Sequence, residues 1–236
     1  CTLFIAGLIY FNYEHGLEYR LIEQISAFPG HFLIYFVAFT IPHLMLSLKR
    51  SPHESLHPAL ITGLVAAPII FAFKVSMDTS INVSDNEHWN QYWNTVIYWP
   101  MRMITMVAIL GVCWFIFNRR DNFYGLSAKK FSYTPYLLML LIMLPLIAAA
   151  STQPDFLATY PKMKEIIPLP GDATPDWFYK LLFQLSYGSD FFSVEIFFRG
   201  FLIVSFIKWV GKDAILPMAC FYCTIHFGKP LGEAIS

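Results

Sequence analysis

Two apolar stretches near the end of the sequence contain ionisable side chains whose types and spacing could perform acid–base chemistry. Glu195 and Arg199 are four positions apart in the run SVEIFFRG, so a helix would place them on one face within pairing distance. His226 lies near the end of the next apolar stretch, in the run FYCTIH. Because an ionisable group inside an apolar membrane segment is costly, we interpret these three residues as a candidate functional site.

The positions of these residues indicate that the carboxylate and the imidazole can meet. Glu195 lies 13 residues before Lys208, on one side of a basic loop. On the other side of this loop, His226 lies 14 residues after Lys212. At about 1.5 Å per residue, both side chains are ~20 Å from the same membrane edge. The pair predicts general acid–base chemistry on a water molecule, and Arg199 would keep the carboxylate ionised. The alternative is a buried polar cluster that joins helices without catalysis.

The composition indicates the environment that holds these residues. Hydrophobic residues make up 56% of the 236 residues and charged residues only 14%, with a mean hydropathy of +0.51, which excludes a water-soluble monomer. The 16 basic and 16 acidic residues cancel, so the chain lacks the basic excess typical of nucleic-acid binding, and we expect no such partner. The expected partner is the lipid bilayer.

We predict an all-α fold, a polytopic membrane helical bundle in which residues 1–236 form a single transmembrane domain. A helix that crosses ~30 Å of hydrocarbon needs about 20 mostly apolar residues. Seven stretches fit this pattern, the first of them short: residues 2–12, 24–48, 57–76, 95–118, 135–151, 177–207 and 214–227. The candidate site would lie between the sixth and seventh helices.

The loop charges predict the orientation of these helices. Three short loops contain Lys49, Arg50, Arg119, Arg120, Lys129, Lys130, Lys208 and Lys212. The other three loops contain only Arg20, Lys162 and Lys164. Because basic loops remain in the cytoplasm, we expect the first set to be cytoplasmic. Lys74 and Arg102, near the outer ends of their spans, should then extend to the lipid headgroups.

The residues around Glu195 and His226 resemble motifs of the CPBP membrane proteases. This family comprises the type-II CAAX prenyl endopeptidases and bacterial bacteriocin-processing and self-immunity relatives. Its pattern is Glu-Glu-x-x-x-Arg, usually followed by Gly, in one helix and Phe-x-x-x-His in the next. Here the corresponding runs are VEIFFRG at residues 194–200 and YCTIH at residues 222–226, in the same order. The resemblance covers mainly residues 193–233.

The resemblance implies a glutamate-dependent intramembrane endopeptidase of the bacterial inner (plasma) membrane. Such an enzyme uses no cofactor or metal and cleaves a membrane-associated peptide or protein by activating water. The resemblance implies catalytic roles for Glu195 and His226 and supporting roles for Arg199 and Tyr222. Lys229 and Glu233 should lie at the outer mouth of the site, as interface residues or as contacts for a substrate.

Two departures from the family pattern favour an alternative function. Val194 stands where the family has its first Glu, the residue that is generally the base, so Glu195 would have to take that role. The third family motif, a later His or Asn, is absent, and the resemblance implies that the protein continues beyond Ser236. The alternative is a catalytically impaired family member that acts as a membrane scaffold or as a partner protein in a membrane-protein complex.

A second alternative is a zinc protease. His53, Glu54 and His57 match the pattern His-Glu-x-x-His, in which two imidazoles one helical turn apart bind zinc and the Glu acts as base. Pro52 and Pro58 flank this run and disfavour the stable helix that the pattern needs. The run also lies in a basic loop without an evident third ligand, so we expect no metal there.

Overall fold

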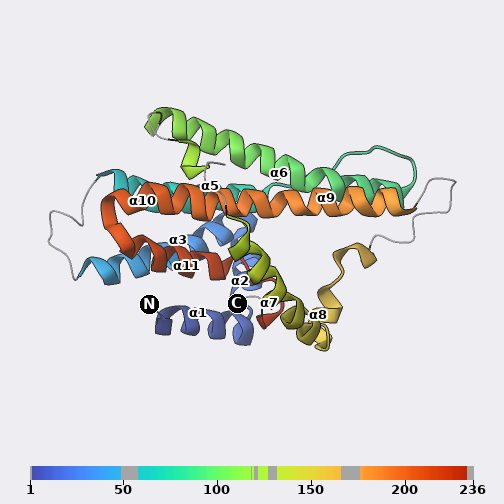
Figure 1. Ribbon diagram of the computed structural model, residues 1–236, viewed down its shortest axis with the longest axis horizontal. Helices are drawn as coiled ribbons and strands as arrows, with labels where there is room; N and C mark the ends of the chain where they lie inside the picture. The colour runs from blue at the N-terminus through green and yellow to red at the C-terminus, as the bar shows by residue number, and fades with distance from the viewer. Residues whose placement is uncertain are drawn as a thin grey trace.

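A computed structural model describes residues 2–48, 58–117, 119, 122–126, 132–165 and 176–232. All regular elements of these residues are helices, which confirms the all-α prediction (Figure 1). In chain order they are α1 (Thr2–His15), α2 (Leu17–Ile25), α3 (Ala27–Ser47), α5 (Pro58–Ser76), α6 (Glu87–Phe117), η1 (Phe123–Gly125), α7 (Thr134–Ala150), α8 (Pro154–Thr159), η2 (Lys162–Glu165), α9 (Asp176–Glu195), η3 (Ile196–Leu202), α10 (Ile203–Val210), η4 (Gly211–Ala214) and α11 (Ile215–Thr224).

Three of these helices, α3, α5 and α6, are long and apolar enough to cross a membrane. They coincide with the second, third and fourth predicted spans. Helix α6 begins at Glu87, earlier than predicted, because the Asn86 side chain accepts a hydrogen bond from the backbone N–H of His88 and caps the helix. Helix α7 is apolar but has only 17 residues, α1 has 14 and α11 has 10. The chain is therefore a helical membrane protein, and the count of seven spans stays a prediction.

The sixth predicted span forms part of one long helical rod made of α9, η3 and α10 (Figure 1). Its middle section, η3, is π-helical over seven residues. The rod ends at Gly211, whose positive φ of 58° suits a residue without a Cβ atom. The short turn η4 then reverses the chain, so that α11 runs back along the rod and contacts α3 and η3.

Helices α1 and α2 form a helical elbow in a region where the sequence predicted a loop over residues 13–23. That prediction was wrong. Gly16 bends the chain with a φ of 63°, and α2 starts at the next residue. The side-chain oxygen of Asn12 accepts a hydrogen bond from the backbone N–H of Glu18 at 2.9 Å and thereby satisfies one free donor of α2. The elbow packs against α3 and α11.

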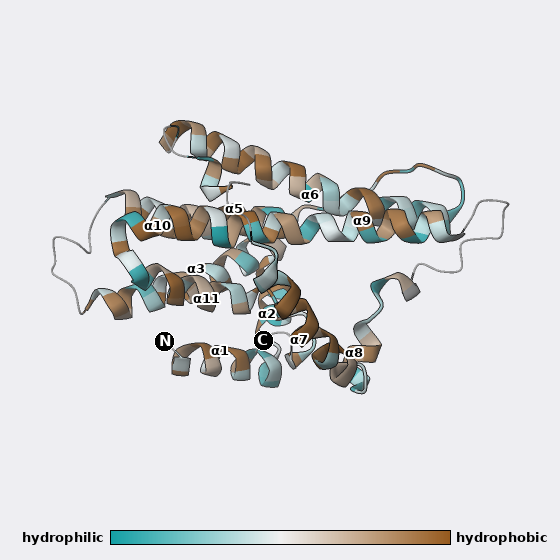
Figure 2. Ribbon diagram, in the orientation of Figure 1, coloured by the Kyte–Doolittle hydropathy of each residue, from teal (hydrophilic) through white to brown (hydrophobic). Residues whose placement is uncertain are grey.

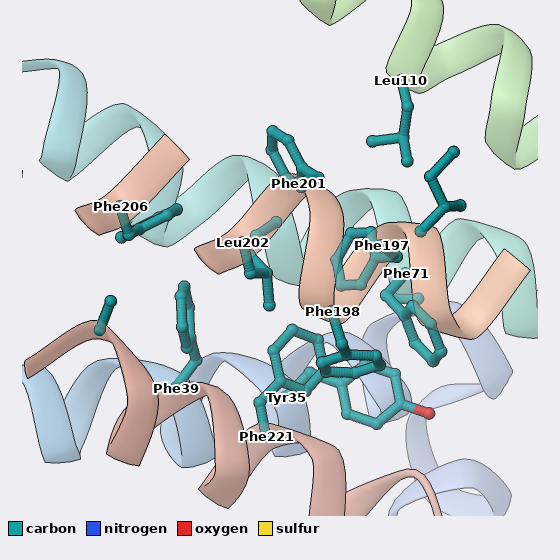
Figure 3. Close-up of a cluster of buried hydrophobic side chains, with 14 of the residues drawn as sticks. Tyr35, Phe39, Phe71, Leu110, Phe197, Phe198, Phe201, Leu202, Phe206 and Phe221 are labelled. Atoms are coloured by element: carbon teal, nitrogen blue, oxygen red, sulfur yellow. The ribbon is translucent and has the colours of Figure 1, made fainter. Parts of the chain in front are cut away.

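Aromatic side chains fill the core between α3, α5, η3, α10 and α11. Figure 3 shows the rings of Tyr35, Phe71, Phe198 and Phe221 gathered between these helices. The ring centroids of Phe198 and Phe221 are 5.1 Å apart, and the planes of the two rings are nearly perpendicular. Aromatic rings favour this edge-on arrangement. This core fixes how the rod and α11 face each other, and the two predicted site segments belong to these two elements.

Helix α7 differs from the bundle because its side chains are exposed all round its axis. Figure 2 shows it as brown, and hence apolar, along most of its length. A helix that is apolar on every side needs an apolar environment on every side. The fifth predicted span covers α7, and its crossing of the membrane stays a prediction.

Candidate functional site

The predicted ion pair between Glu195 and Arg199 is present. Arg199 Nη1 lies 3.0 Å from Glu195 Oε2, with the two residues four positions apart at the start of the π-helical section. The Glu195 side chain is 43% exposed and the Arg199 side chain 70% exposed. The pair therefore lies on an outward surface of the rod, and the carboxylate can be reached by another molecule. Irregular π-helical turns are frequent at functional sites.

His226 follows α11 in a turn that continues the helix. Its Nδ1 lies 3.1 Å from the backbone carbonyl oxygen of Tyr222. A carbonyl can only accept a hydrogen bond, so Nδ1 is the donor and Nε2 of the neutral ring is the acceptor. The imidazole also packs against the Tyr222 ring, with centroids 5.0 Å apart. The carbonyl and the ring of Tyr222 thus orient the imidazole of His226.

Tyr222 belongs to the second predicted segment and contacts the first. Its ring contacts Phe198 of η3 edge-on, with centroids 5.1 Å apart, and its hydroxyl is within electrostatic range of Glu195 and Arg199. The same ring contacts His226. The structure thus brings Glu195, Arg199, Tyr222 and His226 into one region of the molecule, through the contact of η3 with α11.

Val194 and Glu195 lie in different environments although they are neighbours in sequence. Val194 is partly buried and packs against the aromatic core, as do Tyr222 and Ile225 of the returning chain. Glu195 instead turns toward Arg199 on the outer surface of the rod. Val194 therefore contributes to the aromatic core, and it bears no group that could accept a proton.

Lys229 is one of the two residues predicted at the outer mouth of the site, and the structure describes its surroundings. Lys229 is partly buried, and its backbone carbonyl oxygen accepts a hydrogen bond from the hydroxyl of Tyr13 at 2.7 Å. Its charge is within electrostatic range of Lys74. Glu233 lies outside the described residues. The turn that follows α11 is therefore held against the N-terminal helices.

A buried ionic centre near the end of α5, formed by Lys74, Asp190 and Arg102, was not predicted from the sequence. Lys74 Nζ forms an ion pair with Asp190 Oδ1 at 2.7 Å, and the Lys74 side chain is only 3% exposed. Arg102 donates from Nε to the carbonyl of Lys74 at 2.8 Å and from Nη2 to the carbonyl of Val75. Its guanidinium also lies 4.1 Å from the centre of the Tyr98 ring. The prediction that Lys74 and Arg102 extend to the headgroups was therefore wrong.

The physical reason is that both cations have internal partners. Arg102 satisfies carbonyl groups that the end of α5 leaves without helical donors, and its charge complements the negative end of the helix dipole. Asp190 compensates Lys74 and also accepts a hydrogen bond from Ser193 Oγ at 3.2 Å. The signal in the sequence was the presence of opposite charges in separate predicted spans, but it could not identify which residues would pair.

A second polar pair joins the elbow to α3. His31 Nδ1 donates to the carbonyl of Ala27 at 2.7 Å, and His31 Nε2 lies 3.5 Å from Glu18 Oε1. The two contacts tie His31 to its own helix and to α2. His31 is thus a bonded bundle residue and not a metal ligand within the described chain.

Metal binding has no support among the residues that the structure describes. No group of three or more His, Cys, Asp or Glu side chains in this part of the chain could hold a metal ion. Cys113, Cys220 and Cys223 are free thiols. The run from His53 to His57 lies outside the described residues.

Tyr222 connects the two predicted groups, because its ring contacts His226 and its hydroxyl is within electrostatic range of Glu195. Comparison with protein-family models, with curated proteins and with solved structures finds no match to this chain.

Proposed function

We propose that this protein is a glutamate-dependent intramembrane endopeptidase of the CPBP family. It would act in the bacterial inner membrane with seven spans and cleave a membrane-associated peptide or protein. The observation that carries the proposal is the junction of η3 and α11, where the ring of Tyr222 lies against His226 and its hydroxyl is within electrostatic range of Glu195. An accessible carboxylate and an imidazole are groups that can catalyse water-dependent peptide hydrolysis.

In this proposal the Glu195 carboxylate takes a proton from a water molecule, and the resulting hydroxide attacks the carbonyl carbon of the substrate peptide bond. Arg199 holds the carboxylate in place through the 3.0 Å ion pair. The imidazole of His226 positions the water or, when protonated, stabilises the oxyanion that forms on the substrate. The proton held by Glu195 then passes to the leaving amine when the C–N bond breaks, so the carboxylate is regenerated.

Alanine variants at the two positions test this mechanism. Glu195→Ala and His226→Ala should each lower kcat/KM by ~100-fold or more, measured on reconstituted protein with a membrane-anchored peptide. The double variant should be little worse than either single variant, because the two residues act in one step. Glu23→Ala, which removes an exposed carboxylate from α2, serves as the control and should leave the rate unchanged.

Chelation separates this mechanism from zinc chemistry. EDTA should leave the activity intact, because neither Glu195 nor His226 is proposed as a metal ligand. Loss of activity in EDTA, restored by zinc and abolished by His53→Ala, would support the zinc-protease alternative instead.

The environment of Val194 favours a second candidate function. A valine packed into the core occupies the position of the base in the family pattern, so the natural chain would be a catalytically impaired relative that binds a membrane-protein partner. Val194→Glu tests this directly because it restores the family motif. If the natural protein cleaves nothing and Val194→Glu gains activity, Glu195 is not the base and the natural chain is a catalytically impaired protease.

A further inference from the structure

The hydroxyl of Tyr13 contacts the backbone of the segment that carries His226. It donates to the carbonyl oxygen of Lys229 at 2.7 Å and lies 3.2 Å from the carbonyl oxygen of His226. Lys229 lies 216 positions and His226 lies 213 positions after Tyr13 in the chain. Tyr13 thus links helix α1 to the turn that follows α11.

The turn needs such a partner because α11 ends at Thr224. The following residues form single-turn hydrogen bonds, from His226 N to Cys223 O at 3.2 Å and from Lys229 N to His226 O at 3.0 Å. Partly buried carbonyl groups in such a turn need a hydrogen-bond donor. The Tyr13 hydroxyl supplies this donor: its one proton lies between the nearer Lys229 O and the more distant His226 O.

Two further contacts hold the elbow and the turn together. The Tyr13 ring meets the ring of Phe227 edge-on, with centroids 6.5 Å apart, and Phe227 is buried. On the other side of the bend at Gly16, the Glu18 carboxylate lies against Gly228, where an added Cβ atom would be 3.4 Å from Oε2. The elbow therefore contacts three consecutive residues of the turn, Phe227 to Lys229, in addition to the carbonyl of His226.

We infer that Tyr13 is a positioning residue for His226. Its hydroxyl holds the turn after α11 in place and thereby fixes the imidazole relative to Tyr222. The catalytic consequence rests on the proposed endopeptidase function, whereas the holding of the turn does not. The relevant variant is Tyr13→Phe, which removes the hydroxyl and keeps the ring that packs on Phe227.

Hydrogen exchange of the full chain in detergent measures the holding of the turn without any substrate. Amides of residues 225–232 should exchange about fivefold faster or more in Tyr13→Phe, as expected for the loss of one hydrogen bond, while the amides of α3 and α5 keep their protection. Tyr10→Phe is the matched control, because it removes a hydroxyl from the same helix at a residue that is 66% exposed. Unchanged exchange in Tyr13→Phe overturns the inference whatever the activity of the protein.

Kinetics measure the positioning of His226. Tyr13→Phe should lower kcat about tenfold and leave KM unchanged, because a misplaced imidazole affects the transition state and not substrate binding. Tyr10→Phe should behave as the natural protein. Faster exchange with an unchanged kcat overturns the positioning role while the proposed function stands. A natural protein that cleaves nothing overturns the proposed function and the catalytic role, and the exchange result still decides whether Tyr13 holds the turn.

Discussion

Lys74 Nζ lies 2.7 Å from Asp190 Oδ1, and this ion pair joins the end of α5 to the middle of α9. The Asp190 side chain is 25% exposed, so the carboxylate lies at the border of the buried region. Arg102 of α6 binds the same end of α5 through the carbonyl groups of Lys74 and Val75. Three helices thus meet at one charged centre inside an apolar bundle, and the stability of the fold depends on this centre.

Removal of the acidic partner should be strongly destabilising. Asp190→Asn leaves Lys74 buried without a counter-charge, and loss of one partner of a buried pair costs about 3–5 kcal/mol in the free energy of unfolding. Asp85→Asn, at an exposed position outside the bundle, should have no measurable effect. Chemical denaturation in detergent measures both variants. The variant Lys74→Met/Asp190→Leu should recover most of the loss, and a double variant as unstable as Asp190→Asn would contradict the charge argument.

The exposed pair Glu195–Arg199 should contribute much less to stability. Its two side chains are well exposed, and such pairs contribute about 1 kcal/mol or less. Glu195→Gln should disturb the fold less than Arg199→Leu, because Gln still hydrogen-bonds to Arg199 whereas Leu leaves Glu195 without its cation. Melting curves in detergent compare the two variants. Equal and negligible shifts would show that the pair does not contribute to the fold.

Gly63 should be needed for the packing of α5 against α10. A Cβ atom at this position would lie 2.7 Å from Cζ of the buried Phe206, closer than real contacts allow. Gly63→Ala should therefore destabilise the protein by about 1–3 kcal/mol. Gly111→Ala is the control, because no atom lies within 4 Å of its added Cβ, and alanine favours the helix. Equal melting temperatures for the two variants would show that Phe206 moves aside at no cost.

The loop charges predict opposite sides of the membrane for the start of α6 and the end of α10. Single cysteines at Glu87, where α6 begins, and at Lys212, after α10, replace exposed residues in a chain without its natural cysteines. An impermeant thiol reagent should label position 212 only from the cytoplasmic side and position 87 only from the outer side. Labelling of both positions from one side of sealed vesicles would overturn the orientation.

The sequence by itself determined the local structure. Runs of about 20 apolar residues predict helices that cross a membrane, and α3, α5 and α6 lie where these runs occur. The pair of Glu195 and Arg199 was also predictable, because a spacing of four residues joins two side chains within one helix. Both predictions depend only on neighbours along the chain. The bend at Gly16 is a local feature that was not predicted, because residues 13–23 were expected to form a loop.

The tertiary structure decided which helices meet and which polar groups face each other. The pairing of Lys74 with Asp190 and the bond from Tyr13 to Lys229 connect distant parts of the chain. The exposure of Glu195 beside the buried packing of Val194 also depends on how the rod lies against α11. Helical periodicity assigns residues to faces of one helix, but every apolar face can pack against several others. The choice among them comes from the fit of side chains such as Phe198 and Phe221, which no single segment contains.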